Sequence, residues 1–307
     1  MKVSTSLLFD RATERMTALQ NRLATTQAQM TEAKKILSPS DSPDEAAAIQ
    51  RLRGEIERQS GHAETLKSTL QRYTAEETAL SSATDIITRL KELGVQAASD
   101  TMTAPDRKVV AVEMKALRDQ LLGLGNARDD SGNYLFSGTR VDTPAFAEDP
   151  FGKVTYQGDQ TQTRIPAGVE RTVLYTRSGS DVFARVVRED ASGQTTSIAF
   201  FDALDQMVAA VDGNQSAGIH QGLADLDQMH DQIALSLAQT GSDQKLVLSQ
   251  LDVLDQTQLR LKTTLSEVED LDYAEAVTRM QKELTALEAA MGSFSKMSSL
   301  SLFDYLR

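Results

Sequence analysis

The chain has 307 residues, a formal net charge of −12, no cysteine, no tryptophan and three histidines. Without cysteine it has no disulfide, no thiolate nucleophile and no cysteine-ligated metal, and three scattered histidines nearly exclude a histidine-rich metal site. The acidic balance argues against nonspecific binding to nucleic acid or to an anionic membrane, because such binding needs clustered Lys and Arg.

The N-terminal segment predicts a helix with one continuous apolar seam. Its apolar residues follow strict three–four spacing over four repeats, which is the heptad pattern of a coiled coil. At about 1.5 Å per residue this helix would extend roughly 40 Å. The seam consists of Phe9, Ala12, Met16, Leu19, Leu23, Thr26, Met30, Ala33 and Leu37.

Two prolines in the stretch 38–45 end this first helix, and the same stretch starts the next one. Ser42 is a candidate N-cap, Pro43 fits the first helical position and Glu45 completes a capping box. The second helix is expected to run to about Ser99, and a third is expected to start at 103–106.

The middle of the chain changes its character. Nine of the fifteen aromatic residues lie between Tyr134 and Phe201, together with three of the six prolines. Short alternating or β-branched runs there predict strands between turns. The strands are expected at 153–157, 171–177 and 181–187.

The C-terminal part predicts long helices again, with a register slip at 269–272. Asp272 and Glu275 form a second capping-box pattern at the start of the last helix. The apolar positions of that helix keep four–three spacing, and an apolar tail follows. The seam consists of Tyr273, Val277, Met280, Leu284, Leu287, Met291 and Phe294, and the tail contains Leu302, Phe303 and Leu306.

The two terminal arms carry complementary charge. Residues 1–37 hold six basic and three acidic side chains, whereas residues 266–307 hold four basic and eight acidic ones. Exposed charge pairs contribute only about 0.2–1 kcal/mol each, so the apolar seams must drive pairing. The two seams either pair within one monomer or are completed by neighbouring copies, and the strict repeat with its apolar tail favours assembly.

We therefore expect a mainly α, elongated protein with a small β domain. A terminal coiled-coil assembly domain is predicted at 1–41 and 266–307. A helical bundle is predicted at 42–135 and 200–265, and an inserted β-rich outer domain at 136–199.

Motifs that would indicate catalysis or cofactor binding are weak throughout. The Gly123–Gly125 pair lies at a predicted helix end rather than after a strand. The run 129–133 lacks the alternating acids of a calcium loop and is predicted to be a turn. Residues 200–258 hold nine Asp and one basic residue, which indicates a solvated helical face or a docking surface for a basic partner. We predict no catalytic, cofactor-binding or metal-binding residues.

Several motifs together resemble the flagellin superfamily. Residues 27–43 resemble the family's N-terminal segment, although Ala33 stands where the family usually has Gly and Ser42 where it has a second Asp. Residues 265–276 and 300–306 resemble its C-terminal stretch. The centre, Gly-Asn-Tyr-Leu-Phe-Ser-Gly at 132–138, resembles the branch that forms the junction between flagellar hook and filament. The turn residues carrying the resemblance are Asp41, Ser42, Pro43, Tyr134, Phe136, Gly138, Asp270 and Asp272.

This resemblance implies a structural protein rather than an enzyme, with no cofactor. It implies a ring of copies that binds the first hook-associated protein on one side and flagellin on the other. It also implies that the termini are disordered in the isolated subunit and that a cytoplasmic export chaperone binds the C-terminal segment. The protein would be secreted by the flagellar type III apparatus and lie outside the cell, and nucleic acid and membrane are not expected partners.

The residues themselves agree with export of this kind. The segment Met1–Arg11 has only a three-residue apolar run, too short for the apolar region of a secretory signal, so we expect export without a cleaved signal. A filament flagellin remains an alternative, as do an intracellular coiled-coil scaffold or adaptor and, more distantly, an enzyme built on the β insertion.

Overall fold

The structure is a computed structural model that describes residues 2–167, 172–189 and 194–305. Helices predominate, as predicted from the long apolar stripes. They are α1 (Lys2–Glu32), α2 (Pro43–Ala97), α3 (Ala104–Gly125), α4 (Gly179–Val182), α5 (Phe200–Asp212), α6 (Ser216–Glu269) and α7 (Tyr273–Tyr305).

The described strands form three antiparallel hairpins between α3 and α5. Each pair joins two strands that are neighbours in the sequence. They are β1 (Phe146–Glu148) with β2 (Val154–Tyr156), β3 (Arg164–Pro166) with β4 (Thr172–Leu174), and β5 (Val186–Glu189) with β6 (Thr195–Ile198). The predicted fold class, mainly α with a small β region, is confirmed.

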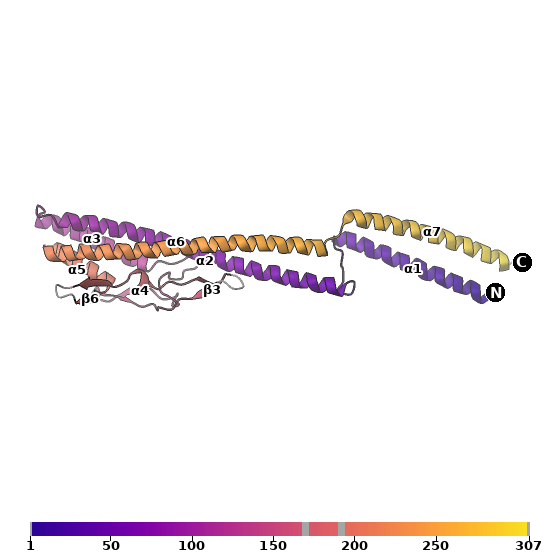
Figure 1. The fold of residues 1–307 in the computed structure, drawn as a ribbon, viewed down its shortest axis with the longest axis horizontal. Coiled ribbons are helices and arrows are strands. Elements are labelled where there is room, and N and C mark those ends of the chain that lie inside the picture. Colours follow the sequence, from indigo (N-terminus) through magenta and orange to yellow (C-terminus); the bar gives the residue numbers. More distant parts are fainter. Residues whose placement is uncertain (1, 168–171, 190–193, 306–307) are drawn as a thin grey trace. The chain divides into compact units, whose positions relative to one another are not determined.

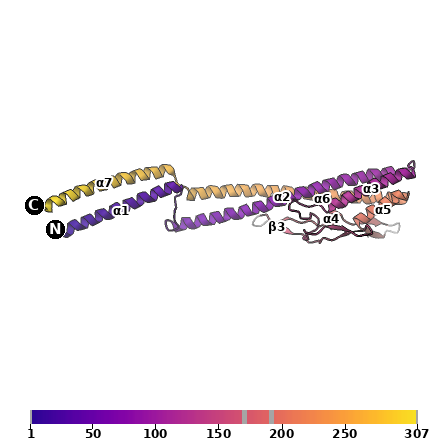
Figure 2. The ribbon, with the colours of Figure 1, turned by 180° about the vertical axis from the view of Figure 1, so that it is seen from behind.

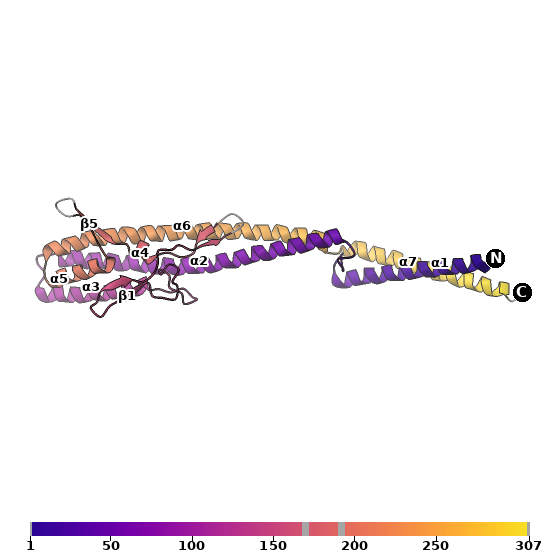
Figure 3. The ribbon, with the colours of Figure 1, turned by 90° about the horizontal axis from the view of Figure 1, so that it is seen from below.

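The chain forms two compact units, and the division lies within α2 and α6. The first unit is Met1–Arg58 with Gln256–Arg307, and the second is Gln59–Asp255. In the first unit α1 and α7 lie side by side (Figure 1). In the second unit the hairpins lie along the helices (Figure 2), and α3 packs against α5 (Figure 3). The three-domain division stays a prediction.

Local signals place the helix starts where the sequence predicts them. The helix α2 starts at Pro43. The Thr103 hydroxyl accepts the amide of Asp106 at 3.4 Å and caps α3. The carboxylate of Asp272 accepts the amides of Ala274 and Glu275 and caps α7. These caps satisfy amide groups that a helix start otherwise leaves unpaired.

The core of the second unit combines long helices with the aromatic part of the insertion. Leu80, Ile87 and Leu90 on α2 are almost completely buried, and they belong to one apolar cluster with Phe136 and Phe201. The rings of this cluster pack mostly edge to face, the arrangement that aromatic quadrupoles favour. A smaller cluster joins α2, the β3–β4 hairpin and α6.

One predicted strand is wrong in its position. The run 181–187 was expected to be extended, but its first residues belong to the short helix α4 and the strand β5 begins only at Val186. The Ser178 hydroxyl accepts the amide of Ser180 and turns the chain into α4. A β-branched and aromatic run does not reveal such a capped turn, because the run indicates burial, and Val182 and Phe183 are buried here within and after a helix.

Buried ion pairs hold the insertion on the helices of the second unit. The guanidinium of Arg177 donates to Glu76 on α2 at 2.8 Å and to Asp243 on α6 at 3.0 Å. Burial raises the pKa of the Glu76 carboxyl, and the charge of Arg177 acts in the opposite direction. Tyr73 donates to the carbonyl of Leu174, and its burial raises the pKa of the phenol.

Candidate functional site

The two terminal helices, α1 and α7, form an antiparallel pair: the start of α1 lies beside the later part of α7, and the end of α1 lies beside the start of α7. The rings of Phe9 and Phe294 pack edge to face, with centroids 5.5 Å apart. The Thr26 hydroxyl donates to Glu283 Oε2 at 3.0 Å, and the Tyr273 hydroxyl donates to the carbonyl of Met30 at 2.9 Å. One contact near the N-terminus of α1 and two near its C-terminus therefore fix one register of the pair.

The side of α7 with the lowest exposure has its own heptad line. Glu283 and Phe294 on this line touch α1, and Ala276 is completely buried. The line consists of Ala276, Met280, Glu283, Leu287, Ala290 and Phe294, all buried or half-buried. Ala276, Glu283 and Ala290 were missed from the sequence, because a search for large apolar residues passes over small and charged side chains.

The remaining predicted seam residues of α7 lie beside this line and are more exposed. Tyr273, Val277, Leu284 and Met291 are 50%, 40%, 37% and 52% exposed. We call these four residues the α7 flank. The last three are spaced seven residues apart, so they occupy the same position in successive heptads, two helical turns apart. The predicted C-terminal seam is thus split between a line of low exposure and an exposed apolar flank.

The predicted seam of α1 is half-buried. Of the large predicted residues, those with described side chains are partly covered: Phe9, Met16, Leu19, Leu23, Met30 and, beyond the helix end, Leu37. Among the described side chains of α1 and α7, only Thr26 and Ala276 are fully buried. Leu302 and Phe303 belong to the part of α7 whose side chains are not described, and Leu306 lies outside the described residues.

Two loops meet where the arms end. The helix α1 ends at Glu32, and Ala33 after it has a left-handed backbone with φ of 56°. The next residue forms an antiparallel bridge with Asp270. The Lys35 amide donates to the carbonyl of Glu269 at 2.8 Å, and the Leu271 amide donates to that of Ala33 at 3.1 Å. The loop after α1 and the loop before α7 are thus joined through their backbones.

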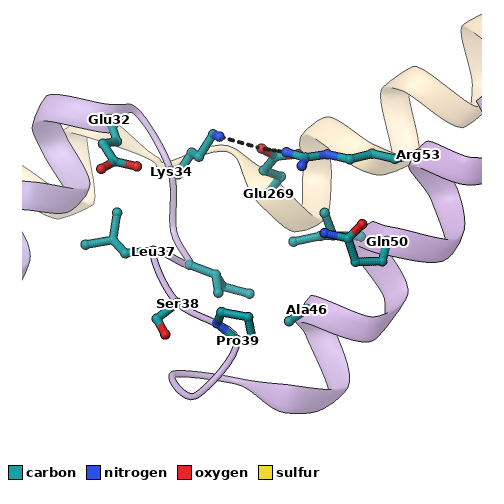
Figure 4. Close-up of a pocket in the computed structure, with 11 residues that line it drawn as sticks. Glu32, Lys34, Leu37, Ser38, Pro39, Ala46, Gln50, Arg53 and Glu269 are labelled. Atoms are coloured by element: carbon teal, nitrogen blue, oxygen red, sulfur yellow. Dashed lines mark hydrogen bonds and ion pairs between the residues drawn. The ribbon is translucent and has the colours of Figure 1, made fainter.

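A shared carboxylate strengthens this loop junction. Glu269, whose side chain is 9% exposed, pairs with Lys34 at 3.3 Å and with Arg53 from α2. Figure 4 shows both cations directed at the carboxylate, beside a pocket of about 140 Å³ that Leu37 and Pro39 also line. One buried acid therefore connects the first loop, α2 and the end of α6.

The turn residues of the N-terminal motif organise this loop. Asp41 Oδ2 accepts the amides of Leu37 and Ser38, the latter at 2.8 Å. Ser42 accepts the amide of Ala46 with its carbonyl, and Pro43 then begins α2. The Asp41 carboxylate and the Ser42 carbonyl thus bind the local backbone where α2 starts.

Ala33→Gly should stabilise the first unit by about 0.5–1 kcal/mol. A left-handed backbone costs a residue with a Cβ atom about 1–2 kcal/mol, and the larger unfolded-state entropy of Gly offsets only part of that. Thermal unfolding followed by circular dichroism checks it. Ala12→Gly, in the interior of α1, should instead lower stability by about 0.5–1 kcal/mol. Equal losses in both variants would contradict this explanation of the turn.

The central motif lies in the second unit and connects the insertion to α2. Tyr134 and Phe136 are buried, and the carbonyl of Phe136 accepts the amide of Gly179 at 2.7 Å. Gly138 has φ of +67°, and a Cβ atom there would lie 2.5 Å from the carbonyl oxygen of Asp159, so only glycine fits. The predicted family turns therefore divide between two places, one in each unit.

The Asp159 carboxylate closes the turn after the central motif. It accepts the backbone amides of Thr139 and Thr161, each at 3.0 Å, and the Thr139 hydroxyl. These hydrogen bonds hold the pKa of the Asp159 carboxyl below its usual range. The predicted turn at 129–133 is confirmed too, because Asp129 Oδ1 accepts the amides of Ser131 and Asn133.

Two features are absent from the described part of the chain. Across its residues no three His, Asp or Glu side chains form a group that would hold a metal ion. None of its helices has the length and hydropathy needed to cross a bilayer. What the described residues do present is a pair of helical arms with an apolar flank.

Comparison with known proteins identifies the family. The model of the bacterial flagellin N-terminal helical region matches residues 3–141, and that of the C-terminal helical region matches residues 223–306. Flagellar hook-associated protein 3 of Escherichia coli strain K12 is 26% identical over 99% of both chains. The protein of the same name from Salmonella typhimurium is 26% identical over 100% of both.

A solved structure shares the fold. The crystal structure of Xanthomonas campestris FlgL matches with a TM-score of 0.62 at 23% identity, over 71% of this chain and 99% of that one. The two terminal helical regions together cover most of this sequence, and they include both arms and the loop junction. The chain belongs to the bacterial flagellin family.

Proposed function

We propose that this protein is a structural subunit of the bacterial flagellum and forms the junction ring between hook and filament. The end-to-end similarity to flagellar hook-associated protein 3 supports this role. In this proposal the ring binds the first hook-associated protein on the hook side and receives flagellin on the other. In this proposal the protein has a structural role, and it contacts other subunits through its pair of terminal arms.

The observation that carries the proposal is the exposed α7 flank. A two-helix pair that leaves Val277, Leu284 and Met291 about 40–50% exposed has not completed its apolar surface. Contiguous exposed apolar surface on a folded chain indicates a partner. We propose that arms of neighbouring copies, and of the subunits above and below, cover this flank in the assembled flagellum.

The low burial within the arm pair explains how the subunit can be exported. An antiparallel pair with few buried side chains is marginally stable, so the arms can open and be threaded through an export channel. A cytoplasmic chaperone would cover the apolar C-terminal segment until secretion. At the growing end, docking onto other arms would supply the burial that the isolated pair lacks.

Deletion of the encoding sequence tests this proposal. The strain should still form hooks, should lack filaments and should release flagellin into the medium. Flagellin is still made and exported, but without the junction ring it has no surface onto which it can assemble. Expression of the unaltered chain should restore filaments. Normal filaments in the deletion strain would contradict the junction role. Hooks without filaments and without released flagellin would instead identify the chain as the filament subunit.

A further inference from the structure

The tip of the β1–β2 hairpin presents one aromatic side chain to solvent. Phe151 is 95% exposed, far more than the other large apolar residues of the described chain. Its turn is well fixed: Asp149 Oδ1 accepts the amides of Phe151 and Lys153 at 2.8 and 2.9 Å, and Gly152 has φ of +85°. Arg118 donates to the carbonyl of Gly152 at 3.0 Å and attaches the turn to α3.

This fixed geometry matters for binding. An exposed aromatic ring on a mobile loop would lose conformational entropy when it is buried. A ring on a turn held by hydrogen bonds has already lost most of that entropy, so its burial in a partner contributes more to affinity. Aromatic side chains of this kind frequently anchor protein interfaces.

The same unit contains a pocket with aromatic walls. It has a volume of about 420 Å³ and lies between the strand β2, the segment after α4 and the start of α5. Phe146, Phe183 and Phe200 are buried residues that form part of its wall, with ring centroids 5.3–5.4 Å apart along the cluster. Such walls accept another ring in the edge-to-face arrangement that aromatic pairs prefer.

The polar groups of the pocket favour an acidic neighbour beside that ring. Lys153 and Arg185 line it and are exposed. The helix α5 starts at the pocket, and its N-cap residue Ala199 supplies no side-chain acceptor to the first amides of the helix. Asp202 in the first turn of α5 lines the pocket as well, so two cations, one carboxylate and the start of a helix surround an apolar cavity, and the cations outnumber the acid. A peptide with an aromatic ring next to a carboxylate matches this arrangement.

We propose that the Asp149–Phe151 turn of one copy inserts into this pocket of a second copy. The turn carries the exposed Phe151 ring and the acidic Asp149. The pocket offers aromatic walls for the ring, and Lys153 and Arg185 for the carboxylate. In the single chain Phe151 is 95% exposed and does not line the pocket, so the ring lies outside the pocket of its own chain. The contact is therefore head to tail, the type of contact that closes a ring. This inference rests on the proposed assembly of copies and names one contact between them.

Cysteine cross-linking tests the contact directly, because the native chain contains no cysteine. Phe151→Cys and Ser180→Cys, a pocket residue, would be expressed together as separate chains in the deletion strain. Oxidation of isolated flagella should give a dimer that disappears on reduction and that neither variant forms alone. As a matched control, Phe151→Cys with Val112→Cys, which is 71% exposed on α3, should give no dimer.

The outcomes separate this contact from the general role. Filaments that form normally without the 151–180 dimer would overturn the inference and leave the junction role intact. Failure of even the unaltered chain to restore filaments would overturn the junction role itself.

A second measurement covers the case in which Phe151→Cys does not assemble. Because the native chain has no tryptophan, Phe151→Trp provides a single indole, which can be excited apart from the six tyrosines. Its emission in the purified full chain should shift to shorter wavelength as the protein concentration rises, and adding Lys153→Glu should reduce that shift. Emission that stays at the wavelength of an exposed indole at all concentrations would overturn the inference.

Discussion

Replacing Arg72 by alanine should destabilise the second unit by about 3–5 kcal/mol, the usual cost of removing one partner of a buried ion pair. Arg72 is 3% exposed. Its guanidinium donates to Asp129 at 2.9 Å and to the carbonyls of Tyr134, Leu135 and Tyr175 at 2.9–3.1 Å. The substitution leaves a buried carboxylate and three carbonyl groups without this donor.

Urea unfolding of the purified full chain measures this loss. Arg89→Ala on the same helix is the matched control, because Arg89 is about half exposed and pairs with the exposed Glu92 and Glu113. The control should shift the unfolding midpoint only slightly, since exposed ion pairs contribute little. Equal shifts in the two variants would show that the buried network around the central motif does not hold the insertion on α2.

The double substitution Val277→Gln and Leu284→Gln should abolish or greatly reduce filament formation. Each side chain is about 40% exposed in the single chain, so its further burial in an assembly contributes about 1 kcal/mol. Two such losses weaken each subunit contact by roughly 30-fold, and the effect repeats in every copy. Glutamine is a good helix former, so α7 itself should persist.

Electron microscopy of cells carrying this variant checks the prediction, together with the amount of flagellin in the medium. Thr278→Gln with Thr285→Gln is the matched control, because these exposed residues are also seven apart and occupy the adjacent heptad position. The control strain should keep its filaments. Normal filaments in the Val277 and Leu284 variant would contradict the role of the α7 flank.

The sequence predicted helices better than it predicted which face of each helix is buried. Large residues at heptad spacing were sufficient to identify α1 and α7. The division of α7 into a covered line and an exposed flank depends on Ala276 and Glu283, which have no apolar signal of their own. In an isolated pair, the face of α7 that lies against α1 is determined by how closely the two helices approach and by the hydrogen bond between Thr26 and Glu283. Neither of these produces a heptad pattern of apolar residues in the sequence.

The turns and the central motif show the same limit. Caps such as Thr103 and Asp272 were predictable because the interaction is local. The role of Arg72 was not, because its acceptors come from segments 57–103 residues away and three of them are backbone carbonyls, which any residue supplies. Likewise, only the structure shows that Ala33 adopts the backbone for which the family's usual Gly is suited.

The physical difference between the two units supports an ordering of their stabilities. The helix α2 contributes several completely buried residues to its core, among them Leu66, Leu80 and Ile87. The described side chains of the arms contribute only Thr26 and Ala276. Since opening free energies follow the amount of buried apolar contact, the arms should open long before the second unit unfolds.

Limited proteolysis of the arms, before and after assembly, tests the central claim most directly. The claim is that the arm pair completes its apolar surface only in contact with other subunits. In the purified chain, protease should remove 1–41 and 266–307 quickly and leave the second unit intact. In isolated flagella, immunoblots should show the same segments protected. Arms that resist cleavage equally in the isolated chain and in flagella would contradict the claim.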